Sequence, residues 1–240
     1  GEGLGAELAP GGPQPDVLNY AWRDYGNRVG AWRLLELLDA LRLPATVLLN
    51  SAMYDHAPAL VAAHRARGDE IAGHGRTNSE RQSALSEAAE RALIAESHAT
   101  PDLLAEAGYA YTLNWCMDDQ PVWLRTRAGR PLLAIPYPQE VNDIPAIVAR
   151  KAGADQFAAM IVADLEERLE QVARDGIPQV MGIALHPYII GQPYRPRALR
   201  GALAALAARR DAGVWIATAG AVFEHAAALP PGILPGDGEG

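Results

Sequence analysis

His74 is the first residue of this chain whose type and setting point to chemistry. It stands between two glycines, directly after the apolar run 70–72, which we interpret as a buried strand. A histidine at the carboxyl end of a strand, just before a helix, lies where α/β sheets and barrels build their sites. The polar residues that follow, among them Arg76 and Asn78, can hold an anion or a carbonyl at the helix N-terminus. The alternative is a partly buried histidine that only packs, but this position favours a functional role.

His186 is the second candidate, because it directly follows another predicted strand, 179–185. Two histidines at the same edge of one sheet can share a pocket. A histidine in such a pocket can donate a proton to a leaving amine or bind a metal ion. We therefore take His74 and His186 as catalytic candidates.

Two polar loops follow the predicted strands 109–115 and 132–137. Asp118 and Asp119 are adjacent in the first loop, and on an extended chain they face opposite ways, so we expect one functional and one structural carboxylate. Turn formation is the alternative for each loop residue. The candidate ligand-binding residues of the two loops are Trp115, Asp118, Tyr137, Glu140, Asn142 and Asp143.

The segment 22–30 is dense in residues that bind small polar ligands. Its arginines can pair with a carboxylate or polarise a carbonyl. Helix capping by Asn27 together with a surface ion pair is the alternative. The candidate substrate-binding residues here are Arg23, Asp24, Tyr25, Asn27 and Arg28.

The composition limits the classes of partner that the protein can bind. The 240 residues are 49% hydrophobic and carry a net charge of -8, so we expect a folded core and binding to neither nucleic acid nor an anionic membrane surface. No apolar run reaches the length that spans a bilayer. Cys116 is the single cysteine, which excludes an intrachain disulfide and fits a cytoplasmic protein. Phosphate-binding and paired Cys-x-x-Cys motifs are absent from the sequence.

The predicted elements alternate between strands and helices, which implies a parallel sheet with right-handed crossovers, either open or closed into a barrel. We expect a single domain over 1–240, with an N-terminal arm at 1–15 and a flexible tail at 230–240. The strands are predicted at 45–50, 70–73, 109–115, 132–137, 179–185 and 214–219. The helices are predicted at 29–41, 58–67, 79–96, 101–107, 144–151, 155–174, 196–210 and 221–228.

The same residues resemble the polysaccharide deacetylase superfamily, carbohydrate esterase family four in the broad sense. The branch that they resemble is the allantoinase-like and cyclic-imide-hydrolase-like one. The matching pieces follow the family's order, at 23–30, 73–78, 118–121, 136–143 and 185–187. The resemblance implies an α/β fold, a distorted (β/α) barrel that lacks one or two strands in this sequence. It also implies hydrolysis of a non-peptide C–N bond.

The resemblance also implies roles. His186 would protonate the leaving nitrogen, His74 would orient the carbonyl or bind a metal, and Asp119 is the candidate base. Arg23, Arg28 or Arg76 would stabilise the oxyanion.

The family's second metal-binding histidine is replaced here by Asn78. A metal-free site is therefore one alternative. The other is a divalent metal, zinc by preference, held by the two histidines and completed by Asp118 or Asp119.

Three functions follow as hypotheses. The first is a C–N hydrolase that deacetylates an N-acetylated sugar or opens a small amide or cyclic imide, in carbohydrate or small-amide metabolism. The second is a catalytically impaired pseudoenzyme that binds such a ligand on the same fold. The third is a subunit that completes its barrel edge with another chain, in a homo-oligomer.

Overall fold

The computed structural model describes residues 16–77 and 101–237. The predicted helix 79–96 and the candidate Asn78 lie outside the described residues. Two compact units emerge from the described chain. Unit 1 contains 16–44, 138–177 and 181–216, and unit 2 contains 45–77, 101–137, 178–180 and 217–237. Each is described by itself, and the expectation of a single domain stays a prediction.

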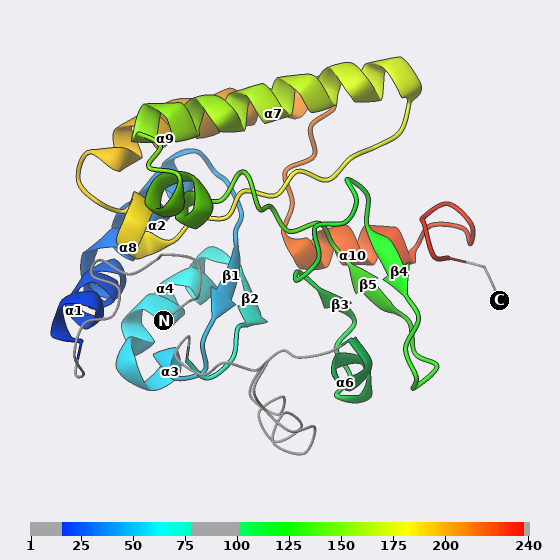
Figure 1. The fold of residues 1–240 in the computed structure, drawn as a ribbon, viewed down its shortest axis with the longest axis horizontal. Helices are drawn as coiled ribbons and strands as arrows, with labels where there is room; N and C mark the ends of the chain where they lie inside the picture. Colours follow the sequence, from blue (N-terminus) through cyan, green and yellow to red (C-terminus); the bar gives the residue numbers. More distant parts are fainter. Residues whose placement is uncertain (1–15, 78–100, 238–240) are drawn as a thin grey trace. The chain divides into compact units, whose positions relative to one another are not determined.

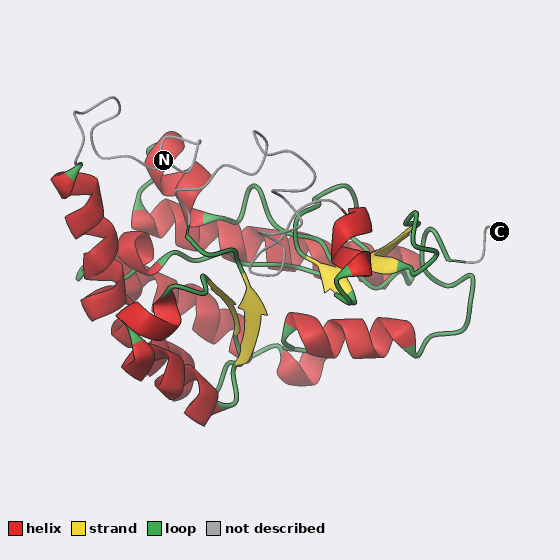
Figure 2. Cartoon of the chain, turned by 90° about the horizontal axis from the view of Figure 1, so that it is seen from below, coloured by secondary structure: helices red, strands yellow, loops and turns green. Residues whose placement is uncertain are grey.

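Unit 1 is built from helices and loops, and the strands drawn in Figure 2 all belong to unit 2. The helical predictions for this unit are confirmed within a few residues at each end. The elements of unit 1 are α1 (Val17–Tyr25), the π-helix η1 (Gly26–Gly30), α2 (Ala31–Ala40), the π-helix η3 (Ile144–Ala149), α7 (Ala154–Asp175), α8 (Pro187–Ile190), α9 (Arg195–Ala207) and the 3₁₀ helix η4 (Arg210–Ala212).

Helix α1 was not predicted, although its start carries a recognisable signal. Asp16 is the N-cap, and its Oδ1 accepts a hydrogen bond of 3.0 Å from the Asn19 backbone N–H. These hydrogen bonds from Asn19 lower the pKa of Asp16. An Asp at this position is a strong N-cap preference, so the capping residue identifies a helix that the short apolar pattern left unclassified.

Glycines let η1 and helix α8, with its C-cap Gly191, approach backbone to backbone. A Cβ added at Gly30 would lie 2.1 Å from the Pro187 carbonyl oxygen, and one at Gly26 would lie 2.7 Å from the Tyr188 backbone nitrogen. A Cβ at Gly191 would in turn lie 2.4 Å from the Cα of Gly30. Any side chain at these positions would push the two segments apart.

The core of unit 1 lies between α7 and α9, which run alongside each other (Figure 1). Phe157 and Ile161 of α7 are fully buried, and Leu199 and Leu203 of α9 pack in the same cluster. Helix α2 adds Leu34, Leu37 and the following Leu43 to this cluster. Burial of such side chains stabilises a fold by roughly 1.5–3 kcal/mol each.

The predicted strand 179–185 does not form. Only Ala184 pairs, in an isolated parallel bridge with Asn142, through its N–H to the Val141 carbonyl at 3.0 Å and its carbonyl to the Asp143 N–H at 3.2 Å. The apolar pattern correctly predicted an extended segment. A strand needs a continuous ladder of backbone hydrogen bonds, and here the ladder is one residue long.

The first sheet of unit 2 pairs β1 (Thr46–Leu49) with β2 (Glu70–Gly73) in parallel, in the register Thr46 to Glu70. The connection contains α3 (Met53–His56) and α4 (Pro58–Arg67). Helix α4 ends where predicted, because Gly68 adopts the left-handed conformation with φ 79° that favours glycine. Both strands and α4 confirm the predictions for this segment.

The second sheet has the order β3-β5-β4 and is partly antiparallel, which corrects the expectation of a parallel sheet. Its strands are β3 (Tyr111–Thr112), β4 (Val122–Leu124) and β5 (Leu132–Ala134), and α6 (Pro101–Glu106) precedes them. β3 pairs with β5 in parallel, whereas β4 pairs with β5 in antiparallel fashion. β4 was not predicted, because three residues are too few to show a strand pattern.

The strand predicted at 214–219 is also absent, and side chains of the β1–β2 sheet bind the backbone that follows it. The Ala219 N–H donates to Thr46 Oγ1 at 2.8 Å, and the Gly220 N–H donates to Glu70 Oε2 at 2.9 Å. These two bonds hold the start of α10 (Ala219–Ala227). A sequence pattern cannot show that a hydroxyl and a carboxylate distant in the sequence bind the first N–H groups of this helix.

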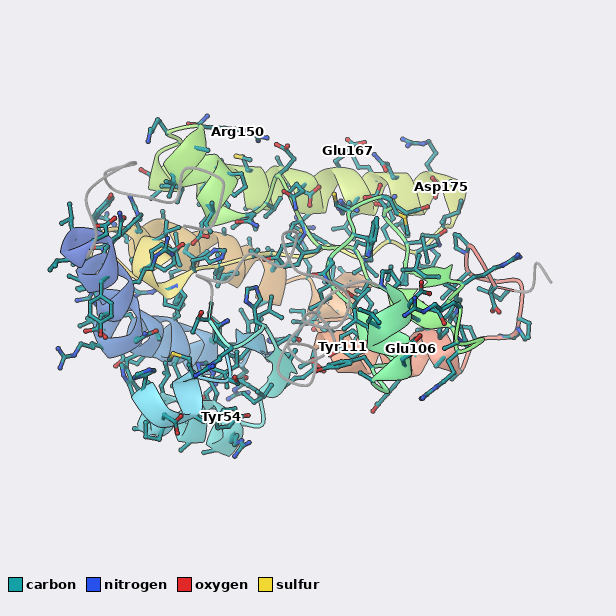
Figure 3. The ribbon with its side chains drawn as sticks, turned by 60° about the horizontal axis from the view of Figure 1, so that its bottom comes forward. Tyr54, Glu106, Tyr111, Arg150, Glu167 and Asp175 are labelled. Carbon is teal, nitrogen blue, oxygen red and sulfur yellow. The ribbon has the colours of Figure 1, made fainter. Side chains whose placement is uncertain are left out.

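Glu70 also accepts hydrogen bonds from the Thr46 hydroxyl, at 2.8 Å, and from the Tyr111 hydroxyl. Tyr111 is labelled in Figure 3. Burial, together with the hydrogen bond to Glu70, raises the pKa of Tyr111 well above its usual range. One carboxylate therefore joins β1, β3 and α10 within unit 2.

A small core of unit 2 forms under this network. Leu133, Ile135, Ala226 and Leu234 are buried together. Leu234 belongs to the segment 230–237, which was expected as part of a flexible tail, and the neighbouring Pro235 carbonyl accepts the Trp123 N–H at 2.9 Å.

A buried ion cluster joins the end of α4 to the start of β2. The Asp69 side chain is 1% exposed and lies 2.7 Å from His64 Nδ1 and 3.0 Å from Arg67 Nε. Burial pushes the pKa of Asp69 upward, but the hydrogen bonds from Arg67 and His64 outweigh it, and the pKa is lowered.

We expect Gly30→Ala to destabilise the protein by about 1–3 kcal/mol, because the new methyl group overlaps the Pro187 carbonyl. Gly201→Ala is the matched control: Gly201 lies inside α9, nothing lies within 4 Å of its added Cβ, and alanine there should stabilise by about 0.5–1 kcal/mol. Urea unfolding measures both. Equal free energies of unfolding for Gly30→Ala and wild type would contradict the close contact.

We expect the stability of the protein to fall in acid partly through Asp69. Because its folded-state pKa is lowered, its contribution is complete above the unfolded value of about 3.9 and is lost as the pH falls through the folded pKa. Asp69→Asn should therefore lower the free energy of unfolding at pH 7, by roughly 1–3 kcal/mol, and much less once the pH lies below the folded pKa of Asp69.

Asp164→Asn is the control for Asp69→Asn, since Asp164 forms a partly exposed pair with Arg168 four residues away on α7 and should change stability by less than about 1 kcal/mol. A difference between wild type and Asp69→Asn that stays constant from neutral to acid pH would refute the assignment.

Candidate active site

Asp143 and His186 form the most specific side-chain pair in unit 1. The Asp143 side chain is fully buried, and its Oδ1 lies 2.6 Å from His186 Nδ1. Its second oxygen, Oδ2, accepts the His186 backbone N–H at 2.8 Å. The His186 ring is 25% exposed, so one edge is held by the carboxylate while part of the ring reaches solvent.

The position of this pair follows from the short bridge between 141–143 and Ala184. That bridge aligns the two extended segments in parallel, and the side chains that follow it meet. The motif segments 136–143 and 185–187 therefore do come together, although no full strand precedes the second one.

Burial raises the pKa of Asp143, and the contacts with His186 oppose that rise. A ring nitrogen that faces a carboxylate oxygen at hydrogen-bond distance is the donor of that bond, so we place a proton on Nδ1 of His186. A carboxylate at Nδ1 fixes the ring orientation and the tautomer, and it leaves Nε2 as the nitrogen that exchanges protons with a substrate.

Tyr188 connects His186 to helix α1. Its buried ring lies 5.8 Å from the His186 ring and 4.9 Å from the Trp22 ring, both edge to face. The Arg23 guanidinium stands over the same ring, 4.9 Å from its centre. Of the three arginines considered for the oxyanion, Arg23 is thus the one that lies in the cluster around His186.

The remaining candidates of α1 and η1 make contacts within their own region. Arg28 pairs with Asp24 at 3.7 Å on the surface, the alternative weighed from the sequence. Tyr25 accepts a hydrogen bond from Arg33, which also donates to the Gly191 carbonyl at 2.9 Å. Asn27 is half-buried in η1. A substrate-binding role for these residues stays a prediction.

The loop before η3 holds Glu140 and Asn142 in different ways. Glu140 is exposed and forms a two-point ion pair with Arg150, which is labelled in Figure 3. The hydrogen bond from Arg150 lowers the pKa of Glu140. Asn142 is buried, and its Oδ1 accepts the Ile144 N–H at 3.1 Å, so it shapes the turn that presents Asp143.

His74 lies in unit 2, at the carboxyl end of β2, as predicted. Its backbone N–H donates to the Leu49 carbonyl at 2.9 Å, and its ring Nδ1 lies 3.4 Å from Asn50 Nδ2. The ring is exposed, and the buried Gly75 that follows has φ 77°. The edge where β1 and β2 end therefore presents an imidazole beside a carboxamide.

The other candidates of unit 2 are exposed or half-buried loop residues. Asp118 Oδ1 accepts the Gln120 N–H at 2.9 Å, the turn contact weighed as the alternative for this loop, and the division of the acidic pair stays a prediction. Asp119 is exposed, and its carbonyl accepts the Val180 N–H at 2.8 Å. The Trp115 carbonyl accepts the Tyr137 N–H at 3.1 Å, and Arg76 is exposed.

His74 and His186 belong to different units, and the pocket shared by both stays a prediction. Within 16–77 and 101–237, no group of three His, Cys, Asp or Glu side chains is arranged to hold a metal ion. The zinc alternative with His74 as a ligand likewise stays a prediction.

Three residues with a place in these clusters were not among the predicted site residues: Trp22, Asn50 and Tyr188. Asn50 carries a usable signal, because it is a polar residue at the end of a predicted strand, at the same level as His74. The two aromatic residues carry none, since an aromatic ring near a helix is usually part of a core.

No family model matches the chain. A curated protein of Schizosaccharomyces pombe (strain 972 / ATCC 24843), named "Putative polysaccharide deacetylase", is 25% identical over 232 residues, which cover 81% of this chain and 72% of that protein. Among solved structures, a "Puue Allantoinase" has a TM-score of 0.76 and 24% identity, over 88% of this chain and 76% of that one.

A "probable Polysaccharide deacetylase" from Pseudomonas aeruginosa PAO1 has a TM-score of 0.78 and 25% identity, over 87% of this chain and 76% of that one. These similarities confirm the resemblance that the ordered motifs indicated. They also confirm the predicted fold class, the α/β barrel type of that superfamily.

We expect Asp143→Asn to reverse the tautomer of His186. The asparagine oxygen must still accept the His186 backbone N–H, so its NH₂ group faces Nδ1 and turns that nitrogen into an acceptor. Nitrogen-15 NMR of the ring at neutral pH should show the proton on Nδ1 in the wild type and on Nε2 in Asp143→Asn. The exposed His56 serves as the internal control, and an unchanged His186 tautomer would refute the geometry.

Proposed function

We propose that this chain, a member of the polysaccharide deacetylase superfamily, hydrolyses the non-peptide C–N bond of an N-acetylated sugar, a small amide or a cyclic imide. The observation that carries the proposal is the Asp143–His186 pair, with its buried carboxylate at 2.6 Å from the imidazole. The names of the similar proteins, a polysaccharide deacetylase and an allantoinase, support C–N hydrolysis as the reaction class.

His186 acts as the general acid. Water adds its oxygen to the carbonyl carbon, the C–N bond breaks, and the leaving nitrogen takes a proton from Nε2 of His186. The imidazolium that gives this proton is stabilised by the Asp143 carboxylate at Nδ1. Such a positioned acid contributes typically 10²–10⁴-fold to the rate.

Arg23 supports the same step through its place beside Tyr188. Its guanidinium lies over the Tyr188 ring, a geometry that holds a long side chain in place while its N–H groups remain donors. We propose that it binds the carbonyl oxygen or a carboxylate of the substrate. Asp119 stays the proposed base that takes the proton of the attacking water.

The products differ between the substrate classes. An N-acetylated sugar gives acetate and an amine, whereas a cyclic imide opens to one molecule that carries both a carboxylate and an amide. Assays of both product types on the purified protein therefore identify the class that is turned over.

We expect His186→Ala to lower kcat/KM by roughly 10²–10⁴-fold on the substrate that the wild type turns over. Asp143→Asn should cause a loss of similar size, and the double variant should lose little more, because the two residues act as one unit. The steady-state rates of the four proteins complete the cycle.

His56→Ala is the matched control for His186→Ala, since His56 is an exposed histidine of α3, and it should keep the wild-type rate. Asp119→Asn and Asp118→Asn test the base in the same assay, with loss expected only for the first. Full activity of His186→Ala, or no turnover of any of the three substrate classes, would overturn the proposal.

No helix among the described residues is long and apolar enough to cross a membrane. A cytoplasmic location is part of the proposal, supported by the single, free Cys116. So is a homo-oligomer, which light scattering of the purified protein would test against a monomer.

A further inference from the structure

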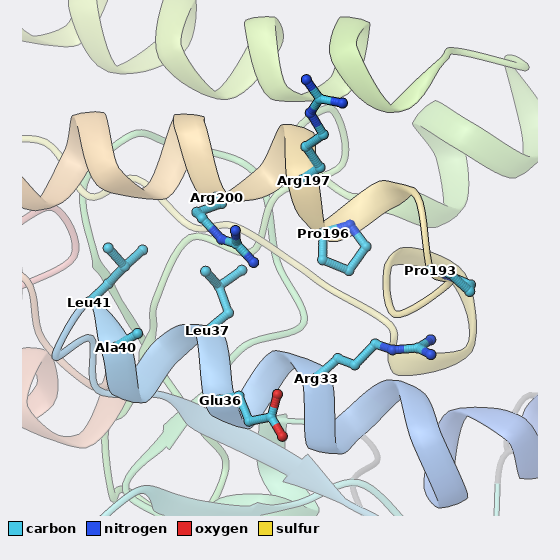
Figure 4. Close-up of a pocket in the computed structure, with 9 residues that line it drawn as sticks. All are labelled: Arg33, Glu36, Leu37, Ala40, Leu41, Pro193, Pro196, Arg197 and Arg200. Carbon is cyan, nitrogen blue, oxygen red and sulfur yellow. The ribbon is translucent and has the colours of Figure 1, made fainter.

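A groove of about 410 Å³ lies on unit 1 between α2 and the first turns of α9 (Figure 4). This volume is within the range of small-molecule sites, about 300–1,000 Å³. None of the residues that line it belongs to the cluster around His186. Its apolar lining consists of Leu37, Ala40, Leu41, Pro193 and Pro196.

The charged lining of the groove is mainly positive. Arg33, Arg197 and Arg200 stand against a single carboxylate, that of Glu36. The chain as a whole has a net charge of -8, so this local excess runs against the general charge of the protein. A concentration of guanidinium groups over apolar surface is the chemistry that binds carboxylates and phosphates.

Two of the three arginines lie near the start of α9, where their positive charges destabilise the helix. Arg197 and Arg200 are three residues apart in its first turns, where no acidic residue is present and the N-cap side chain makes no hydrogen bond. This is the positive end of the helix dipole, which favours anions, and like charges at this spacing repel each other. A bound anion would relieve both effects.

The three guanidinium groups differ in the contacts that they make with the rest of the protein. Arg33 uses Nη1 for Tyr25 and the Gly191 carbonyl. Across 16–77 and 101–237, the guanidinium groups of Arg197 and Arg200 form no ion pair or hydrogen bond. In Figure 4 the Arg200 side chain points toward Leu37 of α2, whereas the Arg197 side chain extends away from α2. Arg200 is therefore the arginine whose position allows it to bind a ligand inside the groove.

We propose that this groove binds a small organic anion, a molecule with one carboxylate or phosphate group on an apolar body. The anionic group meets the Arg200 guanidinium, which points into the groove. The apolar body lies on Leu37, Leu41 and Pro196. Glu36 at the same wall repels a second negative group and selects against more highly charged anions.

The test is a calorimetric titration of the full chain at low salt with four probes. Benzoate and phenyl phosphate carry the two forms of the anion on an apolar ring, benzyl alcohol carries the ring alone, and inorganic phosphate the anion alone. We expect saturable binding of benzoate, phenyl phosphate or both, tighter than either single-feature probe and weakened by added salt. Whichever of the two anions binds more tightly shows whether the groove prefers a carboxylate or a phosphate group.

The decisive comparison is between two variants that each remove one charge from the same helix end. Arg200→Gln should raise the dissociation constant roughly tenfold or more, the loss of a charge-assisted two-point contact, and Arg197→Gln should change it less than about threefold. Both residues are exposed, so thermal unfolding should confirm that the variants fold. Arg33 is left intact because it also holds Tyr25 and Gly191.

Equal weakening by Arg197→Gln and Arg200→Gln would overturn the proposal, since it would show only a general electrostatic effect. So would unchanged binding in Arg200→Gln, which would place the anion elsewhere on the protein. Binding of benzyl alcohol as tight as that of benzoate, or no saturable binding of either ring-bearing anion, would equally refute it. None of these outcomes depends on the hydrolase activity.

Discussion

The close backbone contact between η1 and helix α8 is the constraint on which the arrangement of unit 1 depends. Glycine at positions 26 and 30 leaves no side chain between η1 and the Pro187–Tyr188 backbone of α8. Arg33 strengthens the same contact through the carbonyl of Gly191, the C-cap of α8. Because His186 directly precedes α8, the contact fixes the imidazole relative to α1, and Arg23 is brought over Tyr188.

A second constraint is electrostatic. A carboxylate that is buried without partners would be strongly destabilising, and Asp143 receives both a backbone N–H and a ring N–H from His186. The two donors come from one residue, so satisfying the acid also orients the base. Burial therefore has two effects. It raises the pKa of Asp143, and it makes the carboxylate depend on the two donors of His186, which fixes the orientation of the ring.

In unit 2, the buried Asp69 and the half-buried Glu70 also bind several partners, and they connect elements of the fold. Asp69 and Glu70 are neighbours in the chain and face opposite sides, as expected where a strand begins. Asp69 binds His64 and Arg67 of α4. Glu70 binds Thr46 of β1, Tyr111 of β3 and the start of α10. Two successive acids thus connect elements that short strands alone hold weakly.

Helices with clear apolar spacing and capping residues were predictable from the sequence by itself, because their signals are local. Helix α4 ends at Gly68 and α7 ends at Gly176, both in the left-handed conformation. The ordered motifs also indicated the resemblance to the superfamily, and His74 and His186 became candidates because each directly follows an apolar segment. Asp143 was one of several polar residues in the loop after the predicted strand 132–137. Such positions can be recognised without knowing what the side chains contact.

Only the tertiary structure decided which of these residues meet. The pairing of Asp143 with His186 depends on a single bridge at Ala184, and the start of α10 is bound by side chains from β1 and β2. The direction of β4 was likewise undetermined, because three residues carry no information on their partner. Contacts between residues distant in sequence depend on geometry that no local pattern contains, and the orientation of His186 is set by such a contact.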